Sequence, residues 1–390
     1  MKRFLTLAIA AALLIGACFT FASCGDEATN YAKDNTEFYI GASGPLTGGA
    51  AVYGIAVKNS AEMAVEEINA AGGINGVKIK FVMMDDKHDA SLVSTNYTKM
   101  FEEGMQVSLG CVTTGPCKEW KSLSKDDNLF YITPSASADT IVEFDNAYQM
   151  CFADENQGTT AAQYVNEYVT DTEIGVLYRS DDAYSTGIYN KFKATLSSSK
   201  TLVEASFSGD TVASFASQIQ TLKNCKFIFM PIYYGPAAQF MDEAKNDVSP
   251  DAVYYGCDGL DGIDTGVEGF DISTIPQEVS YLSHFNSKAT TGAAKTYIDK
   301  YVAKYGSDTL NQFGASAYDC IYALKAAIEK AGSKITVTTS PSDFCEALKG
   351  VFQGGFSFSG VTGTNVSWDA SGFVSKTAIK YIVKESSSAK

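Results

Sequence analysis

Short apolar runs alternate with stretches of helical spacing along most of this chain. One series runs through residues 37–45, 54–73, 77–86, 90–104, 107–110 and 129–133, and a second through 173–180, 192–198, 202–208, 213–224, 226–233 and 252–257. In the stretch 54–73 the apolar residues follow one helical face, and Gly72 and Gly73 end the helix. Alternating strands and helices predict parallel sheets with helices on both faces. Because the pattern runs through twice, the sequence predicts an α/β fold with two lobes.

The apolar run 129–133 is followed by Pro134 and then by small hydroxyl residues, Ser135, Ser137 and Thr140. A plain turn also accounts for such residues. Ligands of open parallel sheets, however, bind beyond the carboxyl ends of the strands. Hydroxyl, glycine, tyrosine and acidic residues follow the other predicted strands in the same way, at Ser43 to Pro45, Asp85 and Asp86, Gly110 to Cys117, Arg179 to Tyr184, Tyr233 and Tyr234, and Asp258. Their joint position predicts a binding site at these strand ends.

The amino terminus has the plan of an export signal. Lys2 and Arg3 precede an uncharged stretch from residue 4 to 23, and small residues lead to Cys24. This resembles a bacterial lipoprotein signal, with residues 1–23 removed, Cys24 acylated and 24–36 serving as a tether. Cys18 is a competing site of acylation, and an uncleaved anchor helix is a third reading, because the uncharged stretch is just long enough to span a bilayer. All three place the remaining chain outside the cytoplasmic membrane.

The composition excludes some classes of partner. The formal net charge is −15, and the sequence contains no basic cluster. Such a chain should repel phosphate backbones, so nucleic-acid binding is not expected. No CxxC motif occurs, which argues against structural zinc, and neither a metal site nor another cofactor is expected. Seven cysteines lie beyond the leader, an odd number that cannot pair completely: Cys111, Cys117, Cys151, Cys225, Cys257, Cys320 and Cys345. Cys111 with Cys117, or Cys320 with Cys345, could form a disulfide, and the sequence leaves both options open.

Several motifs, in this order, resemble one known family. They are GPLTGGAAVYG (44–54), INAAGGINGVKIKFVMMDD (68–86), ITPSAS (132–137), DENQG (154–158), DDAYSTG (181–187) and WDASGF (368–373). From about residue 37 to about 384 the chain is similar to the type I solute-binding proteins of branched-chain amino-acid ABC transporters. The resemblance implies the type I periplasmic-binding-protein fold, with two Rossmann-like lobes joined by three crossing strands. It places lobe 1 at 37–153 plus 283–360 and lobe 2 at 154–282 plus 361–385.

The resemblance also implies roles for residues of the site. By this resemblance, the ligand carboxylate would bind the hydroxyls of Thr114 and Ser137 and the backbone of Ser135. The ligand ammonium would bind Asp258, supported by Asp154. The cleft would be lined by Tyr53, Tyr184, Tyr233 and Phe313. His88 and Thr113 stand where the family often carries a disulfide. Packing alone would also explain each tyrosine. A solvated acidic loop would explain Asp258, as would a weak calcium site, although the acidic spacing does not match an EF-hand.

The expected function is therefore capture of a small amino acid, branched-chain or related, between two lobes. The protein would be an extracytoplasmic, lipid-anchored monomer that delivers this ligand to ABC permease subunits. An enzyme is not expected, since the chain has only two histidines and lacks G-x-S-x-G, P-loop and G-x-G-x-x-G motifs. The rival readings are a binding protein for an amide, urea or other small carboxylate, and a ligand-sensing module of the same fold.

Overall fold

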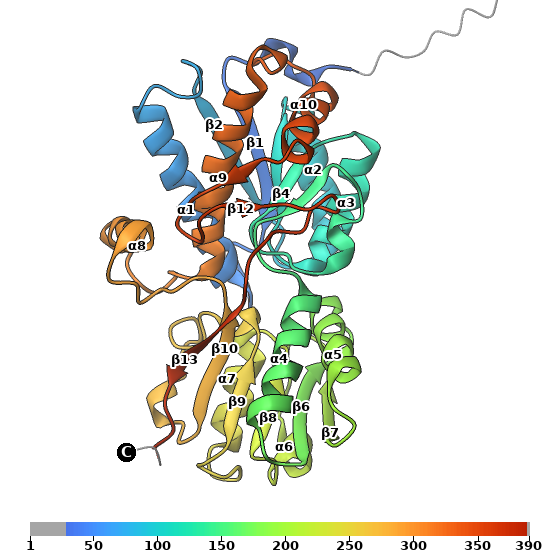
Figure 1. The fold of residues 1–390 in the computed structure, drawn as a ribbon, viewed down its shortest axis with the longest axis vertical. Helices are drawn as coiled ribbons and strands as arrows, with labels where there is room; N and C mark the ends of the chain where they lie inside the picture. Colours follow the sequence, from blue (N-terminus) through green and yellow to red (C-terminus); the bar gives the residue numbers. More distant parts are fainter. Residues whose placement is uncertain (1–28, 388–390) are drawn as a thin grey trace, which may run out of the picture. The chain divides into compact units, whose positions relative to one another are not determined.

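The first sheet contains five parallel strands in the order β2-β1-β3-β4-β5. These are β1 (Phe38–Gly44), β2 (Ile79–Asp85), β3 (Val107–Cys111), β4 (Tyr131–Thr133) and β5 (Ala147–Gln149). One face packs on α1 (Ala51–Ala70), α9 (Gln312–Ala331) and α10 (Pro341–Gln353), and the other on α2 (Val93–Glu102) and α3 (Thr114–Asp126) (Figure 1). Along β1 the side chains alternate between these faces, so Ile40 and Tyr39 belong to different apolar clusters.

The second sheet contains six strands in the order β13-β10-β9-β8-β6-β7, parallel except for β13, which is antiparallel to β10. These are β6 (Glu173–Arg179), β7 (Thr201–Phe207), β8 (Phe227–Met230), β9 (Val253–Gly256), β10 (Glu278–Ser283) and β13 (Ile379–Lys384). Helices α4 (Asp154–Tyr168) and α5 (Ala183–Thr195) cover one face, and α6 (Ala216–Leu222) and α7 (Tyr234–Ala244) cover the other. The two predicted series of strands and helices thus form two sheets, and we call each sheet with its helices a lobe.

The chain passes between the lobes three times, as Figure 1 shows. The passages follow β5, β10 and the short pair of β11 (Ser357–Phe358) and β12 (Val366–Ser367). After the second passage, α8 (Gly292–Tyr305) packs on α1, where the Tyr297 and Ser60 hydroxyls are 2.8 Å apart.

The third passage comes later than the sequence predicted. Residues from 361 were expected in the second lobe, but the Asp319 carboxylate on α9 accepts the backbone N–H groups of Val361 and Thr362, each at 2.8 Å. Further along, the Trp368 indole donates to the Gln149 carbonyl at the end of β5. These bonds hold the segment against the first lobe, and the chain joins the second sheet only at β13. The expected boundary at residue 361 is therefore too early.

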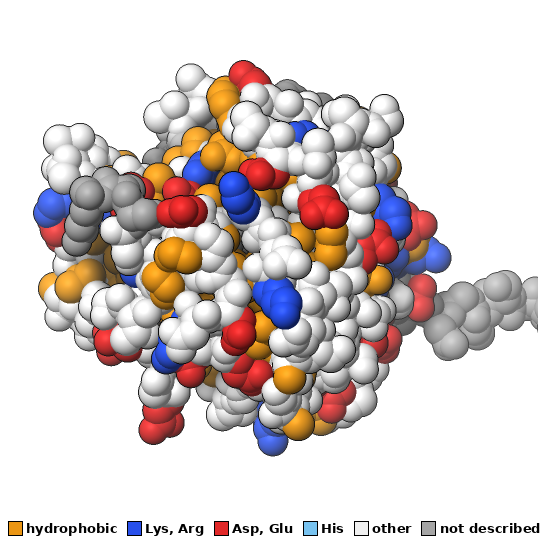
Figure 2. Space-filling model, turned by 90° about the horizontal axis from the view of Figure 1, so that it is seen from below, with side chains coloured by type: hydrophobic (Ala, Val, Ile, Leu, Met, Phe, Trp, Pro, Cys, Tyr) orange, Lys and Arg blue, Asp and Glu red, His pale blue; other side chains and the backbone are white. Residues whose placement is uncertain are grey.

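This computed structural model describes residues 29–387, so the predicted acylation site at Cys24 lies outside the described residues. Within that range no helix combines the length and the apolar character that crossing a membrane requires. The seven cysteines of the described residues are buried free thiols, and neither pairing that the sequence left open is formed. On the face shown in Figure 2, lysine and arginine side chains are interspersed with carboxylates, in keeping with the acidic composition.

Candidate functional site

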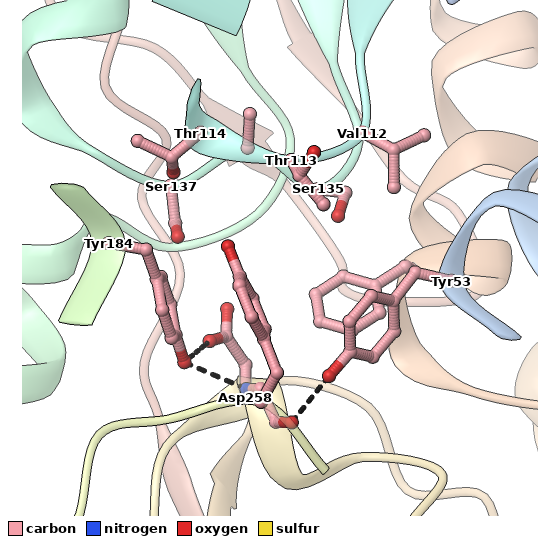
Figure 3. Close-up of a pocket in the computed structure, with 12 residues that line it drawn as sticks. Tyr53, Val112, Thr113, Thr114, Ser135, Ser137, Tyr184 and Asp258 are labelled. Atoms are coloured by element: carbon pink, nitrogen blue, oxygen red, sulfur yellow. Dashed lines mark hydrogen bonds between the residues drawn. The ribbon is translucent and has the colours of Figure 1, made fainter. Parts of the chain in front are cut away.

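A small pocket, with a cavity volume of about 10 Å³, lies where strand ends of both lobes meet (Figure 3). It is lined by Tyr53, Val112, Thr113, Thr114, Ser135, Ala136, Ser137, Tyr184, Tyr233, Asp258, Gly259 and Phe313. Eight of the nine predicted ligand-binding residues are in this set, and the ninth, Asp154, lies close by. The structure thus brings together groups that the sequence separates by as much as 260 positions, from Tyr53 to Phe313.

The serine turn after β4 is held in place by Thr133. The Thr133 hydroxyl oxygen accepts the backbone N–H of Ala136 at 3.1 Å and of Ser135 at 3.3 Å, and the hydroxyl donates to the Cys111 carbonyl at 3.0 Å. These bonds tie the turn to the neighbouring strand β3. In Figure 3 the hydroxyls of Ser135 and Ser137 point toward the middle of the site.

The start of α3 provides a second set of donors beside these serines. Thr114 is the first residue of this helix, and its buried hydroxyl has no partner. The Thr113 hydroxyl does not cap the helix, because it lies 2.9 Å from Nδ1 of His88. The first N–H groups of a helix have no intrahelical partners, and a helix amino terminus attracts anions. This corner therefore offers donors without adding a fixed charge.

Asp258 faces these donors from the second lobe. Its Oδ1 accepts the Tyr184 hydroxyl at 2.7 Å, and its backbone N–H donates to Oε1 of Gln157 at 2.9 Å, whereas Oδ2 is buried without a partner. Burial raises the pKa of Asp258 to about 7, although the hydrogen bond from the Tyr184 hydroxyl and the nearby Gln157 side chain act in the opposite direction. A buried carboxylate oxygen without a donor is costly, so Oδ2 of Asp258 can accept a cation or a hydrogen-bond donor.

Asp154 lies behind Asp258 at the start of α4. Its backbone N–H donates to the Ser137 carbonyl at 2.8 Å, and its Oδ2 is buried without a partner. Burial raises the pKa of Asp154 well above its ordinary value, and the nearby charge of Asp258 adds to this effect. Asp154 thus links the serine turn of the first lobe to the acid of the second, but it does not line the cavity.

Aromatic rings form the remaining wall. Tyr184 and Tyr233 stack with their centroids 4.9 Å apart, and Tyr53 meets Phe313 edge-to-face at 5.0 Å. The Tyr53 hydroxyl reaches from the first lobe to donate to the Gly259 carbonyl of the second. The predicted tyrosines therefore both pack and line the cavity, so the two readings of these residues are not exclusive.

The sequence predicted no ligand contact for Val112, Thr113, Ala136 and Gly259, which also line the cavity. It offered little signal for them, because such residues are common in any strand-end loop. Gln157, which orients Asp258, could have been predicted from the sequence, because it lies three residues after Asp154, on the same face of α4. The acidic pair at the end of β2 makes hydrogen bonds within the first lobe: Asp86 accepts the Ser43 hydroxyl at 3.0 Å, and Asp85 accepts the Leu46 N–H at 2.9 Å.

Known proteins resemble this chain in sequence and in fold. The chain is 29% identical over 325 residues to the leucine-, isoleucine-, valine-, threonine-, and alanine-binding protein of Pseudomonas aeruginosa, a match that covers 80% of this chain and 81% of that protein. A branched-chain amino acid transporter substrate binding protein from Streptococcus pneumoniae, solved in complex with isoleucine, superposes with a TM-score of 0.77 at 23% identity, covering 90% and 96% of the two chains. A solute binding protein from R. palustris, solved in complex with benzoate, gives 0.76 at 18% identity, covering 89% and 93%.

These structural likenesses confirm the predicted type I periplasmic-binding-protein fold. In sequence, residues 37–381 match the family described as "Periplasmic binding protein", and this range contains all six motifs. The resemblance drawn from the six motifs is thereby confirmed at the level of the family. The chain belongs to the periplasmic binding protein family.

Proposed function

We propose that this protein binds a free α-amino acid in the cavity and delivers it to the permease subunits of an ABC transporter. The strongest support comes from buried hydrogen-bonding groups that lack partners on opposite walls of the cavity. Oδ2 of Asp258 is buried without a donor, while the Thr114 hydroxyl, at the amino terminus of α3, is buried without an acceptor. An α-amino acid carries an ammonium group that suits the Asp258 wall and a carboxylate that suits the Thr114 wall.

The energetics favour a zwitterion over a ligand with one charge. A carboxylate that leaves water needs several donors, and each charge-assisted hydrogen bond contributes about 1.5–3 kcal/mol net. An ammonium placed at Asp258 would neutralise a carboxylate that is otherwise expensive to ionise in the cavity. Since the two poles are met from different lobes, the ligand would favour closure through the three passages, by a hinge motion.

The comparisons support this choice of ligand class. The named relatives bind leucine, isoleucine, valine, threonine and alanine in one case and isoleucine in another. Val112, Tyr53 and Phe313 supply apolar area for an aliphatic side chain. We therefore propose a branched-chain or smaller aliphatic amino acid, bound by Tyr53, Thr114, Ser135, Ser137, Tyr184, Tyr233, Asp258 and Phe313, with Asp154 in support. Lipid attachment through Cys24 and action as a monomer complete the proposal.

A second candidate follows from the benzoate complex of the R. palustris protein. Four aromatic side chains line the cavity, which suits an aromatic carboxylate as well as an aliphatic one. Such an anion would leave Oδ2 of Asp258 without a donor and would place a negative charge near it. Asp258 therefore favours the amino acid.

Binding should become weaker in acid. The pKa of Asp258 is about 7, and an ammonium beside it would lower that value. Below about pH 7, ligand binding must then release a proton, whereas above that pH no proton is released. Calorimetric affinities should be constant near pH 8 and fall by up to about tenfold per pH unit below about pH 7. Asp258→Asn should bind weakly with a flat profile; a flat profile in the parent chain would contradict the pairing.

A thermal-shift screen of the leader-less chain tests the proposed function. A ligand that binds only the folded state at about 100 times its Kd stabilises it by about 2.7 kcal/mol. Leucine, isoleucine, valine, threonine and alanine should raise the melting temperature, whereas benzoate and urea should not. A response to benzoate alone would favour the second candidate, and no response to any amino acid would contradict the proposal.

A further inference from the structure

His88 lies in a tight turn that directs its side chain toward the cleft. Lys87 and His88 both have left-handed backbone angles, with φ of 55° and 65°. Such angles are uncommon for residues other than glycine, and here the turn is held by hydrogen bonds. The His88 N–H donates to Oδ1 of Asp86 at 3.0 Å, and the Lys87 N–H donates to Oδ1 of Asp85 at 2.9 Å.

The imidazole contacts groups of both lobes. In the first lobe its Nδ1 is 2.9 Å from the Thr113 hydroxyl, next to the unpartnered Thr114 hydroxyl. Toward the second lobe its ring meets the Tyr233 ring edge-to-face, with centroids 5.4 Å apart and an angle of 87°. Tyr233 in turn stacks on Tyr184, whose hydroxyl donates to Asp258. His88 therefore joins the loop with the free donors to the rings that orient the acid.

We propose that His88 is a positioning residue that latches the closed cleft and slows ligand release. This inference rests on the proposed function, since it assigns a role in the same site. Because the His88–Tyr233 contact joins the two lobes, it exists only while the lobes are together. Its loss should therefore affect the closed, ligand-holding state and leave the encounter of ligand with the open state unchanged.

The charges around His88 favour an uncharged ring. Burial lowers the pKa of His88 below its ordinary value, and Arg179 lowers it further, while Asp89, Asp182 and Asp210 raise it. At neutral pH the imidazole is therefore neutral. Depending on the tautomer, Nδ1–H donates to the Thr113 hydroxyl oxygen or Nδ1 accepts the hydroxyl proton. The latch is thus a packing and hydrogen-bonding contact, not an ion pair with the carboxylates of the second lobe.

The test is His88→Asn in the leader-less chain. Asparagine tolerates a positive φ and retains a polar group near the position of Nδ1, so the turn and the bond to Thr113 can persist. It removes the ring that meets Tyr233. Lys87→Asn is the matched control, because Lys87 is exposed and has the same kind of backbone angle. Stopped-flow fluorescence would measure the association and dissociation rates of leucine, valine and alanine in turn.

His88→Asn should release the bound amino acid about three- to tenfold faster, with unchanged association and an unchanged order of preference. Thr113→Val, which removes the bond to Nδ1 but keeps the His88 ring against Tyr233, should have a smaller effect in the same direction. If His88→Asn and Lys87→Asn release ligand at the same rate, the latch is contradicted, even if His88→Asn melts at a lower temperature. If the parent chain binds none of the three amino acids, the proposed function fails first and the latch falls with it.

Discussion

Asp258→Ala is expected to weaken amino-acid binding by about 2–5 kcal/mol, the usual cost of truncating one partner of a buried charge pair. The reason is geometric. Tyr184 and Gln157 already orient Asp258, and Oδ2 remains buried without a partner. Without this oxygen the ligand ammonium would leave water for a cavity wall that offers no carboxylate in its place. Isothermal titration calorimetry on the leader-less chain would measure the loss.

A control from the same loop separates this effect from general loss of acidity. Asp264→Asn removes an exposed carboxylate six residues away and should leave the affinity unchanged. Asp258→Ala should melt at or above the parent temperature, because removing an unsatisfied buried carboxylate relieves a desolvation cost. Equal affinity of parent and Asp258→Ala for the same amino acid would show that the ammonium does not lie at Asp258.

The amide of a bound amino acid should bind at least about 100-fold more weakly than the free acid. Amidation retains the ammonium but removes the negative charge that the Thr114 hydroxyl, the α3 terminus and the serine turn would meet. Losing two charge-assisted hydrogen bonds costs about 3 kcal/mol or more. Competition calorimetry of leucine and leucinamide measures the ratio in one protein preparation.

Thr114→Val should reduce the preference for the acid over the amide, because it removes one of the donors and preserves the shape of the side chain. Ser122→Ala, which removes an exposed hydroxyl from the same helix, is the matched control and should leave the ratio intact. Leucinamide that binds as well as leucine would indicate a different ligand class or a different pose.

The sequence predicted the location of the site because strand ends of a parallel sheet share one edge. Thr114 and Ser135 follow short apolar runs of the first sheet and Asp258 follows one of the second, so periodicity placed each at a strand end. The resemblance to two-lobed binding proteins was needed to bring the two edges together. The sequence also indicated that the chain folds as two repeated α/β units. These features depend on local pattern, which a single sequence carries.

Other features depend on contacts between distant segments, and local pattern did not carry them. Asp319 on α9 holds residues 361 and 362 against the first lobe, and nothing near residue 361 signals this partner. Likewise, Tyr53 bonds across the cleft to Gly259, and the His88 ring reaches Tyr233 only when both lobes are in place. The free thiols of Cys111 and Cys117 show the same limit, since their spacing was compatible with a disulfide that the fold does not form.

A crystal structure of the leader-less chain with a bound amino acid would show directly which groups meet the two charges of the ligand. We expect the ammonium nitrogen about 2.7–2.9 Å from Oδ2 of Asp258, and the carboxylate against the Thr114 hydroxyl and the serine turn. A ligand in the reverse orientation, or with its ammonium facing bulk solvent, would contradict it.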